Sequence, residues 1–440
     1  MTAIILFGVF FLLVMLRMPI AVALAISSIV VLFTGSGLFG LELVADIMYT
    51  SVAKFTLLAI PFFILAGVIM EHAGISKRLI DFAQALVGHR KGGIIFVTVM
   101  TAIFFAAISG SGPATVAAIG GILIPGMVKN GYKTETAAGL VASSGAIGII
   151  IPPSIAFIVF AVVAGDQIPV SIGRMFMAGV IPGLLLGVGF IVAAMFVRHR
   201  QEKREGPISE QYIMQPATSA ERFKAFGKAI WGLLIPVIIL GGIYGGFFTP
   251  TEAAVVAVFY SLFIGFFIHR ELTLKKLYDI LVAAGIQTAV VMFIVSAASV
   301  YAYIITTEQI ATQISDVMLN ISSNKIIILL LINIILLIAG MFIDAISAYY
   351  IFIPILLPIV LLFDVDPTVF GVFMTVNLAI GLFTPPVGLN LFVAAGISNT
   401  SIGQISRGVF PFVVSSVIIL LLITYIPQIS TFLPDLLNIK

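Results

Sequence analysis

The sequence contains no cysteine, and few of its residues carry charge. Without thiols among its 440 residues, it can form neither a disulfide framework nor a thiolate metal site. Lys, Arg, Asp and Glu together make up 9% of the chain, whereas a soluble domain carries about 25%. Histidine occurs only four times, and no HExxH motif is present. These shortages argue against a soluble fold and against a zinc-dependent enzyme.

The sequence is rich in long apolar stretches. Hydrophobic residues make up 61% of the chain, and apolar stretches near 20 residues recur along its length. The sequence therefore predicts an all-α polytopic membrane protein embedded in a lipid bilayer. The expected crossings lie at 3–16, 18–34, 54–70, 133–165, 173–197, 227–247, 252–268, 279–304, 367–398 and 408–427. The basic residues stand in short loops between these spans, so the pI near 9.0 does not indicate nucleic-acid binding.

The basic residues also predict the orientation of the chain. Most of the 22 Lys and Arg residues fall on one side when the N-terminus is placed outside, and cytoplasmic loops are enriched in such residues. The N-terminal stretch 1–19 has neither a basic n-region nor an A-x-A cleavage site. It is therefore expected to remain as the first span, with Arg17 behind it.

Two of the expected crossings are interrupted by the same motif. Residues 144–157 read SGAIGIIIPPSIAF and residues 377–390 read NLAIGLFTPPVGLN, so Pro152 and Pro385 are 385 − 152 = 233 positions apart. Inside a bilayer, irregular backbone survives only against protein or a water-filled cavity. A simple proline kink would explain one copy. Two copies at one offset favour a binding site, in which freed carbonyls hold a cation and half-helix N-termini attract an anion.

Each break follows an apolar segment that is itself interrupted at mid-length. We read 92–128 and 324–362 as two re-entrant hairpins, with the tips at SGSG (109–112) and at 340–347. Pro113 suits the first turn of a half-helix. Asp344 is the one acidic residue placed within the membrane, and such residues are functional candidates. The alternative is that Asp344 and Ser347 only cap a half-helix.

A pair of amphipathic stretches extends the repeat. The stripe Ile75, Leu79, Phe82 and Leu86 has the same helical spacing as the stripe Ile310, Ile314, Val317 and Ile321. Both stretches are expected to lie along a membrane surface, the first inside and the second outside. The two halves are therefore predicted to be inverted repeats, which is a pattern typical of secondary transporters. The motif TPTEAA (249–254) is expected to be structural, with Thr249 and Glu252 forming a capping box.

The candidate site residues come from the tips and the breaks. Those proposed to bind sodium are Ser109, Gly110, Ser111, Gly112, Ala146, Gly148, Ile151, Pro152, Gly340, Asp344, Ala379, Gly381, Thr384 and Pro385. Those proposed to meet the substrate are Ser143, Ser144, Pro153, Ser347, Asn377, Pro386 and Asn390. A proton relay needs a chain of titratable groups, and only Asp344 is in place. We therefore expect coupling to two or more sodium ions and a carboxylate substrate.

Four motifs in this sequence resemble one transporter family over essentially the whole chain. SGSGPATVAAIG, GIIIPPS, FFTPTEAA and GLFTPPVGLNLFVA are similar to motifs of the large membrane subunit of TRAP (tripartite ATP-independent periplasmic) transporters, the DctM type, within the ion transporter superfamily. The resemblance implies sodium-driven uptake across the bacterial inner membrane, with a periplasmic N-terminus on the orientation above. It also implies two partners, a small four-helix membrane subunit on a separate chain and a periplasmic substrate-binding protein. Its general character is similar to the sialic-acid branch, and a C4-dicarboxylate is the other substrate considered.

Three other functional classes share part of this pattern. A stand-alone sodium/dicarboxylate symporter of the same superfamily would have the same hairpins and breaks. A channel would not need two inverted hairpins. A membrane enzyme would need a base, and the histidines, at His72, His89, His199 and His269, are predicted to lie at span ends, out of reach of the hairpin tips.

The same segments divide the chain into two expected bodies with an elevator motion between them. The scaffold comprises 1–70 and 227–305, and the transport domain comprises 92–200 and 323–440. The arms at 71–91 (cytoplasmic) and 306–322 (periplasmic) connect them, and 201–226 is expected to be a cytoplasmic loop between the repeats.

Overall fold

The structure is a computed structural model that describes residues 2–206, 208 and 216–439, and all regular secondary structure in them is helical. Eight of the described helices are long and apolar enough to cross a membrane. An all-α membrane fold is therefore confirmed. The helices of the first half are α1 (Thr2–Met15), α2 (Ile20–Ser36), α3 (Leu38–Val52), η1 (Phe55–Leu58), α4 (Ala59–His72), α5 (Ile75–Val87), α6 (Gly93–Ser109), α7 (Gly112–Lys129), α8 (Thr134–Gly145), η2 (Ala146–Ile149), α9 (Ile155–Ala164) and α10 (Ile172–Glu205).

The second half repeats this order of elements. Its helices are α11 (Ser219–Tyr244), α12 (Pro250–Phe263), the π-helical turn η3 (Ile264–Ile268), α13 (Leu274–Thr307), α14 (Ile310–Ile321), α15 (Lys325–Gly340), α16 (Ala345–Leu362), α17 (Pro367–Gly381), α18 (Leu389–Ser398), α19 (Ile402–Tyr425) and α20 (Gln428–Leu436).

The helix boundaries follow the 233-residue offset closely. Helix α7 shifted by 233 gives 345–362, which is the span of α16, and α8 and α9 shift to 367–378 and 388–397, beside α17 and α18. The expected hairpins are helix pairs, α6 with α7 and α15 with α16, and the expected breaks separate α8 from α9 and α17 from α18. Both breaks contain a cis Pro–Pro bond.

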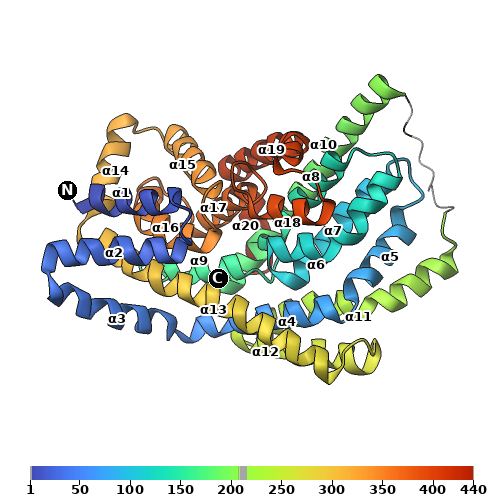
Figure 1. Cartoon of the computed structure of the whole chain (residues 1–440), viewed down its shortest axis with the longest axis horizontal. Helices are drawn as coiled ribbons and strands as arrows, with labels where there is room; N and C mark the ends of the chain where they lie inside the picture. The colour runs from blue at the N-terminus through green and yellow to red at the C-terminus, as the bar shows by residue number, and fades with distance from the viewer. Residues whose placement is uncertain (1, 207, 209–215, 440) are drawn as a thin grey trace.

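The two halves interlock in space. Figure 1 shows α3, α13, α4, α12 and α11 as a broad row along the lower edge, with α6 to α8 and α15 to α19 above it. Helix α13 packs against α16, and α4 packs against α6, so each hairpin touches the lower row. Helix α8 packs against α19, and α18 packs against both α7 and α8. The hairpins and breaks of both repeats thus form one packed unit.

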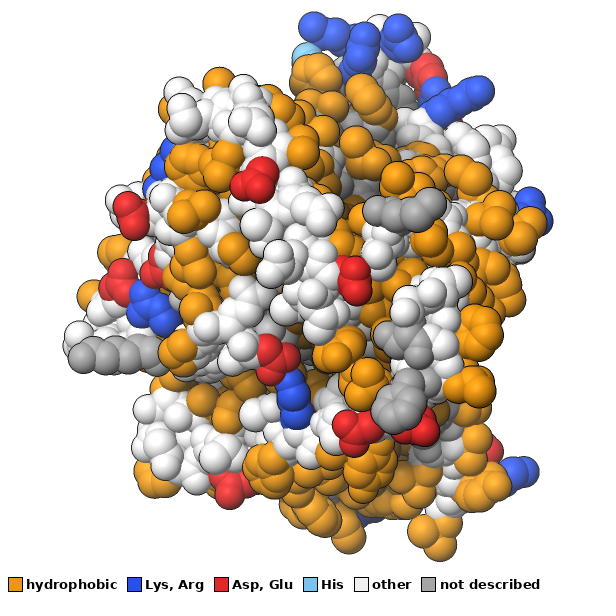
Figure 2. Space-filling model, turned by 90° about the vertical axis from the view of Figure 1, so that its left-hand side faces the viewer, with side chains coloured by type: hydrophobic (Ala, Val, Ile, Leu, Met, Phe, Trp, Pro, Cys, Tyr) orange, Lys and Arg blue, Asp and Glu red, His pale blue; other side chains and the backbone are white. Residues whose placement is uncertain are grey.

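Apolar side chains cover much of the surface as well as the core. Figure 2 shows hydrophobic side chains over much of the face it displays, with basic side chains gathered at its upper rim. Helix α10 is an example, because Val188, Val192 and Phe196 are 57–63% exposed on its apolar part. These exposed side chains are apolar and form no hydrogen bonds, so they suit contact with lipid.

Two helices were not expected from the sequence, and one loop is shorter than expected. Helix α3 contains Glu42 and Asp46, which dilute the apolar signal of that segment, and α20 is a short amphipathic helix at the C-terminus. The expected loop at 201–226 is partly helical, since α10 continues to Glu205 and α11 begins at Ser219. Residues 207 and 209–215 of that loop lie outside the described residues.

The predicted capping box is present, and both amphipathic stretches are helical. Thr249 and Glu252 form the capping box at the start of α12. The first arm is helix α5, whose residues Ile75, Leu79 and Phe82 are buried. The second is helix α14, where Ile310 is buried but Val317 and Ile321 remain about 60% exposed. The second stripe therefore turns part of its apolar face outward.

Candidate functional site

The tip of the first hairpin lies directly against the first break. Helix α6 ends at Gly110, whose φ of 61° is the left-handed conformation that glycine adopts without strain. A Cβ atom on Gly110 would lie 2.8 Å from the carbonyl oxygen of Pro153. A Cβ atom on Gly148 would lie 2.6 Å from the Ser111 carbonyl oxygen and 2.7 Å from Thr115 Oγ1. The glycines on both sides are therefore what allows the tip and the break to touch.

Three hydroxyl and carbonyl groups meet at this tip. Ser109 Oγ lies 2.8 Å from Thr115 Oγ1, and the Thr115 hydroxyl donates a hydrogen bond of 2.8 Å to the Ser111 carbonyl. Thr115 is fully buried. It was not among the residues predicted from the sequence, although it stands one helical turn after Ser111, where a side chain returns to the same helix face.

The second tip meets the second break in the same way. A Cβ atom on Gly381 would collide with the carbonyl group of Gly340, so the backbones of α15 and α17 are in contact there. Gly381 and Gly148 are 381 − 148 = 233 residues apart, which makes them equivalent in the two repeats. Asp344 is the N-cap of α16: Oδ1 accepts from the backbone amides of Ile346 and Ser347, and Oδ2 accepts from Ser347 Oγ at 2.6 Å. The capping role considered for Asp344 and Ser347 is thus present.

Both breaks leave runs of backbone carbonyls without hydrogen-bond donors. Within the described part of the chain, the carbonyl oxygens of residues 150–153 and of residues 383–387 accept no hydrogen bond. Residues 150–153 are all buried. Buried carbonyls normally find a partner, and each unpartnered one costs free energy. Oxygen atoms of this kind can coordinate a dehydrated cation, and the sodium site expected at the breaks stays a prediction.

Asn390 connects the second repeat to the first tip. Its side-chain amide donates a hydrogen bond of 2.9 Å to the carbonyl of Ala142 on α8. A Cβ atom on Gly112 would lie 3.1 Å from Asn390 Oδ1. That oxygen is buried and has no hydrogen-bond partner among the described residues. The amide of Asn390 therefore presents a free acceptor beside tip 1.

Two of the other predicted substrate-facing side chains, Asn377 and Ser143, form separate hydrogen bonds. Asn377 donates hydrogen bonds to Asn333 Oδ1 at 2.7 Å and to the Phe373 carbonyl, and Asn333 donates to Thr424 Oγ1. This buried network joins α15, α17 and α19. Ser143 donates to the carbonyl of Gly139 on its own helix, whereas Ser144 Oγ is buried without a partner in the described structure. Ser143 and Ser144 stand on α8 between Ala142, whose carbonyl accepts from Asn390, and Gly145, whose Cβ atom would lie 3.3 Å from Asn390 Nδ2.

The remaining predicted residues follow the backbone of the breaks. Thr384 Oγ1 donates to the Ile380 carbonyl at 2.6 Å, one turn back on α17. Ser154, which was not predicted, caps α9 by accepting from the Phe157 amide. The residues placed within or beside the breaks and buried are Ala146, Ile151, Pro152, Pro153 and Ala379. Pro385 is half-buried and Pro386 is exposed.

A cavity of about 500 Å³ opens at the second tip. Its walls are the start of α2 (19–22), part of α13 (Val290, Phe293 and Ile294), tip 2 (340–344), and the second break (Leu382 and 387–389). Asp344 is the one ionisable side chain among these lining residues, and no Lys or Arg lines the cavity. The cavity therefore lies between segments of the two expected bodies, and its lining side chains offer an anion no positive charge.

Comparison with known proteins agrees with this architecture. The family model described as "Tripartite ATP-independent periplasmic transporter, DctM component" matches residues 7–429. The chain is 46% identical to an isethionate TRAP transporter permease protein, DctMQ, of Oleidesulfovibrio alaskensis over 97% of this chain, and it spans 66% of the length of that relative. It is 39% identical to the C4-dicarboxylate large permease protein DctM of Rhodobacter capsulatus over the whole of both chains.

Solved structures share the fold at low sequence identity. The YdaH transporter of Alcanivorax borkumensis superimposes with a TM-score of 0.62 at 11% identity, covering 88% of each chain. MtrF of Neisseria gonorrhoeae superimposes with a TM-score of 0.60 at 13% identity, covering 89% of this chain and 85% of that one. The helix breaks, the paired hairpins and the matching family model lead to one conclusion: the chain belongs to the DctM family of tripartite ATP-independent periplasmic transporters, as a multi-pass large permease component.

Proposed function

We propose that this permease component imports an organic acid anion and uses the inward movement of sodium ions to drive that import. The relatives are named for isethionate, C4-dicarboxylates, sialic acid and 2,3-diketo-L-gulonate. All of these are organic anions, although their sizes differ. The shared chemistry supports an anionic substrate for this chain, and a carboxylate is the class we propose.

We also propose two protein partners. The family is described as tripartite and periplasmic, and one relative, DctMQ, is longer than this chain. These observations support a small membrane subunit and a periplasmic substrate-binding protein, which would deliver the anion to the outer face. The partner protein, rather than the permease, would then make most of the choice between acids.

Because no basic residue lines the cavity, the positive charge that holds an anion there would have to come from elsewhere. The cavity at tip 2 has no Lys or Arg among its lining residues, and one carboxylate, Asp344, lies in its wall. A bare carboxylate substrate would be repelled by Asp344. Bound sodium ions at the tips and breaks would offset that repulsion, so the substrate would bind well only after sodium. This order couples the two fluxes without any titrating relay.

The single observation that carries the proposal is the pair of unpartnered carbonyl runs, at 150–153 and 383–387. Each run lies beside a hairpin tip, and the first has Ser109 and Thr115 hydroxyls next to it. Two sites moving one charge each through the membrane would contribute about 2.3 kcal/mol per charge at 100 mV, roughly 4–5 kcal/mol in total.

Reconstituted transport tests this coupling directly. The full permease with its membrane subunit is placed in proteoliposomes, and the binding protein is loaded with radiolabelled acid outside. We expect uptake to require an inward sodium gradient and to rise with sodium concentration with a Hill coefficient above 1. Uptake driven by a pH gradient in sodium-free buffer would refute sodium coupling, while leaving membership of the family untouched.

Asp344 separates a capping role from a cation role. The substitution Asp344→Asn keeps an acceptor for the Ile346 and Ser347 amides but removes the charge. We expect its melting temperature to stay close to that of the native protein, and the sodium concentration for half-maximal uptake to rise at least tenfold. The control Ser347→Ala removes the hydroxyl that donates to Oδ2. If Asp344→Asn transports with native sodium dependence, Asp344 is only a cap.

We further propose that the hairpins and breaks move together past the scaffold in an elevator motion. The packing of α18 on α7 and α8, and of α19 on α8, supports a single moving unit built from both repeats. The proposed unit comprises 92–200 and 323–440, against a scaffold of 1–70 and 227–305.

A further inference from the structure

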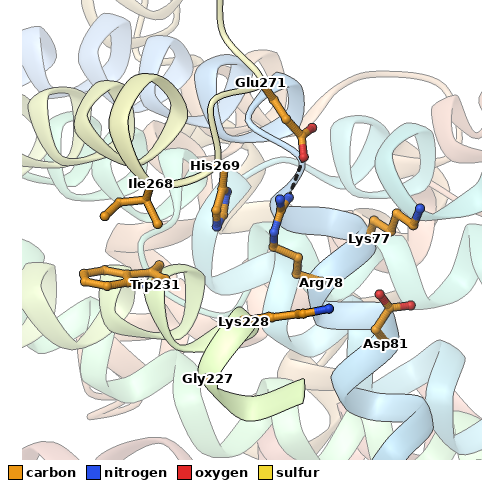
Figure 3. A pocket seen from close by; sticks show the side chains of 9 residues that line it. All are labelled: Lys77, Arg78, Asp81, Gly227, Lys228, Trp231, Ile268, His269 and Glu271. Atoms are coloured by element: carbon orange, nitrogen blue, oxygen red, sulfur yellow. Dashed lines mark hydrogen bonds and ion pairs between the residues drawn. The ribbon is translucent and has the colours of Figure 1, made fainter. Parts of the chain in front are cut away.

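A polar pocket of about 450 Å³ lies away from the hairpins, where the first arm meets residues 227–231 of α11. Three segments form it, as Figure 3 shows: α5, α11, and the turn after η3. The lining residues are Lys77, Arg78, Asp81, Gly227, Lys228, Trp231, Ile268, His269 and Glu271. None of them belongs to the transport site described above.

One arginine is already committed to holding the pocket together. Arg78 Nη1 lies 2.7 Å from Glu271 Oε1 and also donates to the Gly74 carbonyl at 2.7 Å. These bonds fix α5 to the turn after η3, and the dashed line in Figure 3 marks the ion pair. The Glu271 charge is therefore largely neutralised by Arg78 and does not repel an anion strongly.

Two lysines remain available in the same pocket. Neither Lys77 nor Lys228 makes an ion pair or hydrogen bond with any residue that the structure describes. Asp81 is the remaining carboxylate, and it too has no ion pair within 4.0 Å among the described residues. The charges of Arg78 and Glu271 cancel each other. The two lysines and one aspartate that remain give the pocket a net positive charge.

A buried histidine nitrogen points to a missing ligand. His269 Nδ1 lies 2.8 Å from the Ala73 carbonyl oxygen, which can only accept, so Nδ1 carries the proton. His269 Nε2 is buried and has no partner in the described structure. Figure 3 shows the ring directed into the space between Trp231, Lys228 and Arg78. An anion in this space would pair with the two lysines and would favour the protonated ring of His269, in which Nε2 becomes a donor as well.

The place of the pocket identifies the class of anion. Trp231 and Ile268 give the pocket an apolar wall. Trp231 stands where the apolar part of α11 begins, three residues after Lys228, and Ile268 is the last residue of the candidate span Pro250–Ile268. Trp is enriched at membrane interfaces. Helix α5 beside it is strongly amphipathic, with a buried apolar stripe. Basic pockets between helices on the cytoplasmic side are a known mode of binding anionic lipid headgroups, and the basic residues of this chain predict that this side is cytoplasmic.

We propose that this pocket binds a phosphate group at the membrane surface, with Lys77 and Lys228 as its donors, with His269 Nε2 donating once the bound anion has favoured the protonated ring, and with an anionic phospholipid as its source. The phosphate would bridge α5 on one side and α11 on the other. Its acyl chains would leave past Trp231 and Ile268 into the bilayer. A lipid in this place would hold the first arm against the scaffold.

Lipid binding to a charge-matched pair of variants tests the site. The full chain is purified in a neutral detergent and titrated with phosphatidylglycerol or with phosphatidylcholine, and adducts are counted by native mass spectrometry. The pocket variant is Lys77→Gln with Lys228→Gln. The control is Lys224→Gln with Lys275→Gln, which removes the same charge from exposed residues outside the pocket.

We expect phosphatidylglycerol to bind the native chain and the control alike, and the pocket variant about 10- to 30-fold more weakly, since each basic residue at the surface is worth about fivefold. Phosphatidylcholine should bind all three proteins equally. If the pocket variant binds phosphatidylglycerol as well as the control does, general surface charge explains the binding and the site is refuted.

A second experiment distinguishes a lipid phosphate from a soluble phosphate. The melting temperature of each protein is measured with inorganic phosphate, glycerol 3-phosphate or phosphatidylglycerol. Stabilisation by the lipid alone, lost in the pocket variant, supports the membrane source. Equal stabilisation by the soluble phosphates, also lost in the pocket variant, would keep the phosphate site but overturn the lipid as its source.

Discussion

Single glycines decide how closely the tips approach the breaks. Gly148 leaves no room for a methyl group, because its Cβ atom would lie 2.6 Å from the Ser111 carbonyl oxygen and 2.7 Å from Thr115 Oγ1. Both neighbours belong to the proposed cation site, so a substitution here strains that site first. The equivalent Gly381 is even tighter against Gly340.

We expect Gly148→Ala to cost about 1–3 kcal/mol of stability through overpacking and to remove most of the sodium-dependent rise in melting temperature. The matched control is Gly121→Ala on α7, whose added methyl would have open space around it. Thermal unfolding with and without sodium measures both effects. An unchanged sodium response in Gly148→Ala would show that tip 1 and the first break do not form a cation site.

His269 gives a pH dependence of known sign. Burial is the largest cause that lowers the pKa of His269 below its ordinary value of 6.5, and the Arg78 charge lowers this pKa further. The hydrogen bond to the Ala73 carbonyl and the Glu271 charge act in the opposite direction and raise it. Lys77, Asp81 and Lys228 also face the same pocket. Because the folded protein favours the neutral ring, His269 contributes stability above pH 6.5, and this contribution is lost as the pH falls through the lowered value.

We therefore expect His269→Asn, which keeps an amide donor for Ala73, to flatten the fall in melting temperature between pH 7.5 and pH 5.5. The measurement is made in phosphate-free buffer without added lipid. The control is His199→Asn, at an exposed position on α10. Parallel curves for the native chain and His269→Asn would mean that another group carries the acid sensitivity.

At the scale of elements, the sequence predicted the segments that carry a local pattern. The hairpins, the breaks and the arms each have a signature in the chain: a glycine tip, a Pro–Pro motif, or a stripe at helical spacing. Helix α3 has no such signature, because Glu42 and Asp46 interrupt its apolar run. Thr115, one helical turn after Ser111, could have been placed beside tip 1 from its spacing alone, whereas Asn390 could be placed there only in three dimensions, since it comes from the other repeat.

Helix α20 shows how a tertiary contact fixes an element with weak sequence signal. Arg174 at the start of α10 lies 2.8 Å from Asp435 Oδ1 and 3.5 Å from Asp366 Oδ2, and it donates to the Ile439 carbonyl at 2.7 Å. Its side chain is only 20% exposed, although Asp435 is 56% exposed. Screening therefore weakens the ion pair to Asp435, while the better-shielded guanidinium holds the C-terminal segment.

We expect Arg174→Gln to release α20, with a loss of about 1–2 kcal/mol in the local opening free energy. Hydrogen exchange followed by mass spectrometry should show faster exchange in 428–436 and little change in α19. The control is Arg200→Gln, further along the same helix and exposed. Unchanged exchange in α20 would mean that packing of its buried residues Ser430 and Pro434 is sufficient.

At the scale of the whole molecule, the two proposed bodies pack directly where α13 meets α16 and where α4 meets α6. One edge of the boundary is instead polar and exposed. Lys54, just before η1, lies 2.6 Å from Asp166 Oδ1, which follows α9. Their side chains are 37% and 61% exposed, so the pair contributes at most about 1 kcal/mol and can break without large cost. Tyr244 on α11 donates to the Gly173 carbonyl at the start of α10. By contrast with this exposed edge, the packing of α8 on α19 and of α18 on α7 and α8 lies within the proposed moving unit.

This difference makes a locking experiment possible, and the cysteine-free chain suits it because no native thiol can compete. A Cβ atom at Gly173 on α10 would lie 3.8 Å from Ile243 Cγ2 on α11, so Gly173→Cys with Ile243→Cys places two thiols across the boundary. A Cβ atom at Gly189 on α10 would lie 2.7 Å from Ser415 Oγ on α19, so Gly189→Cys with Ser415→Cys places two thiols inside the moving unit. In an elevator motion the first pair must separate by many ångströms during each cycle, whereas the second pair keeps its distance.

We expect oxidation to abolish uptake in the first variant and reduction to restore it. We expect the second variant to transport in both states. If the oxidised first variant still transports, α10 does not move against α11, and the motion must be confined to the hairpins themselves.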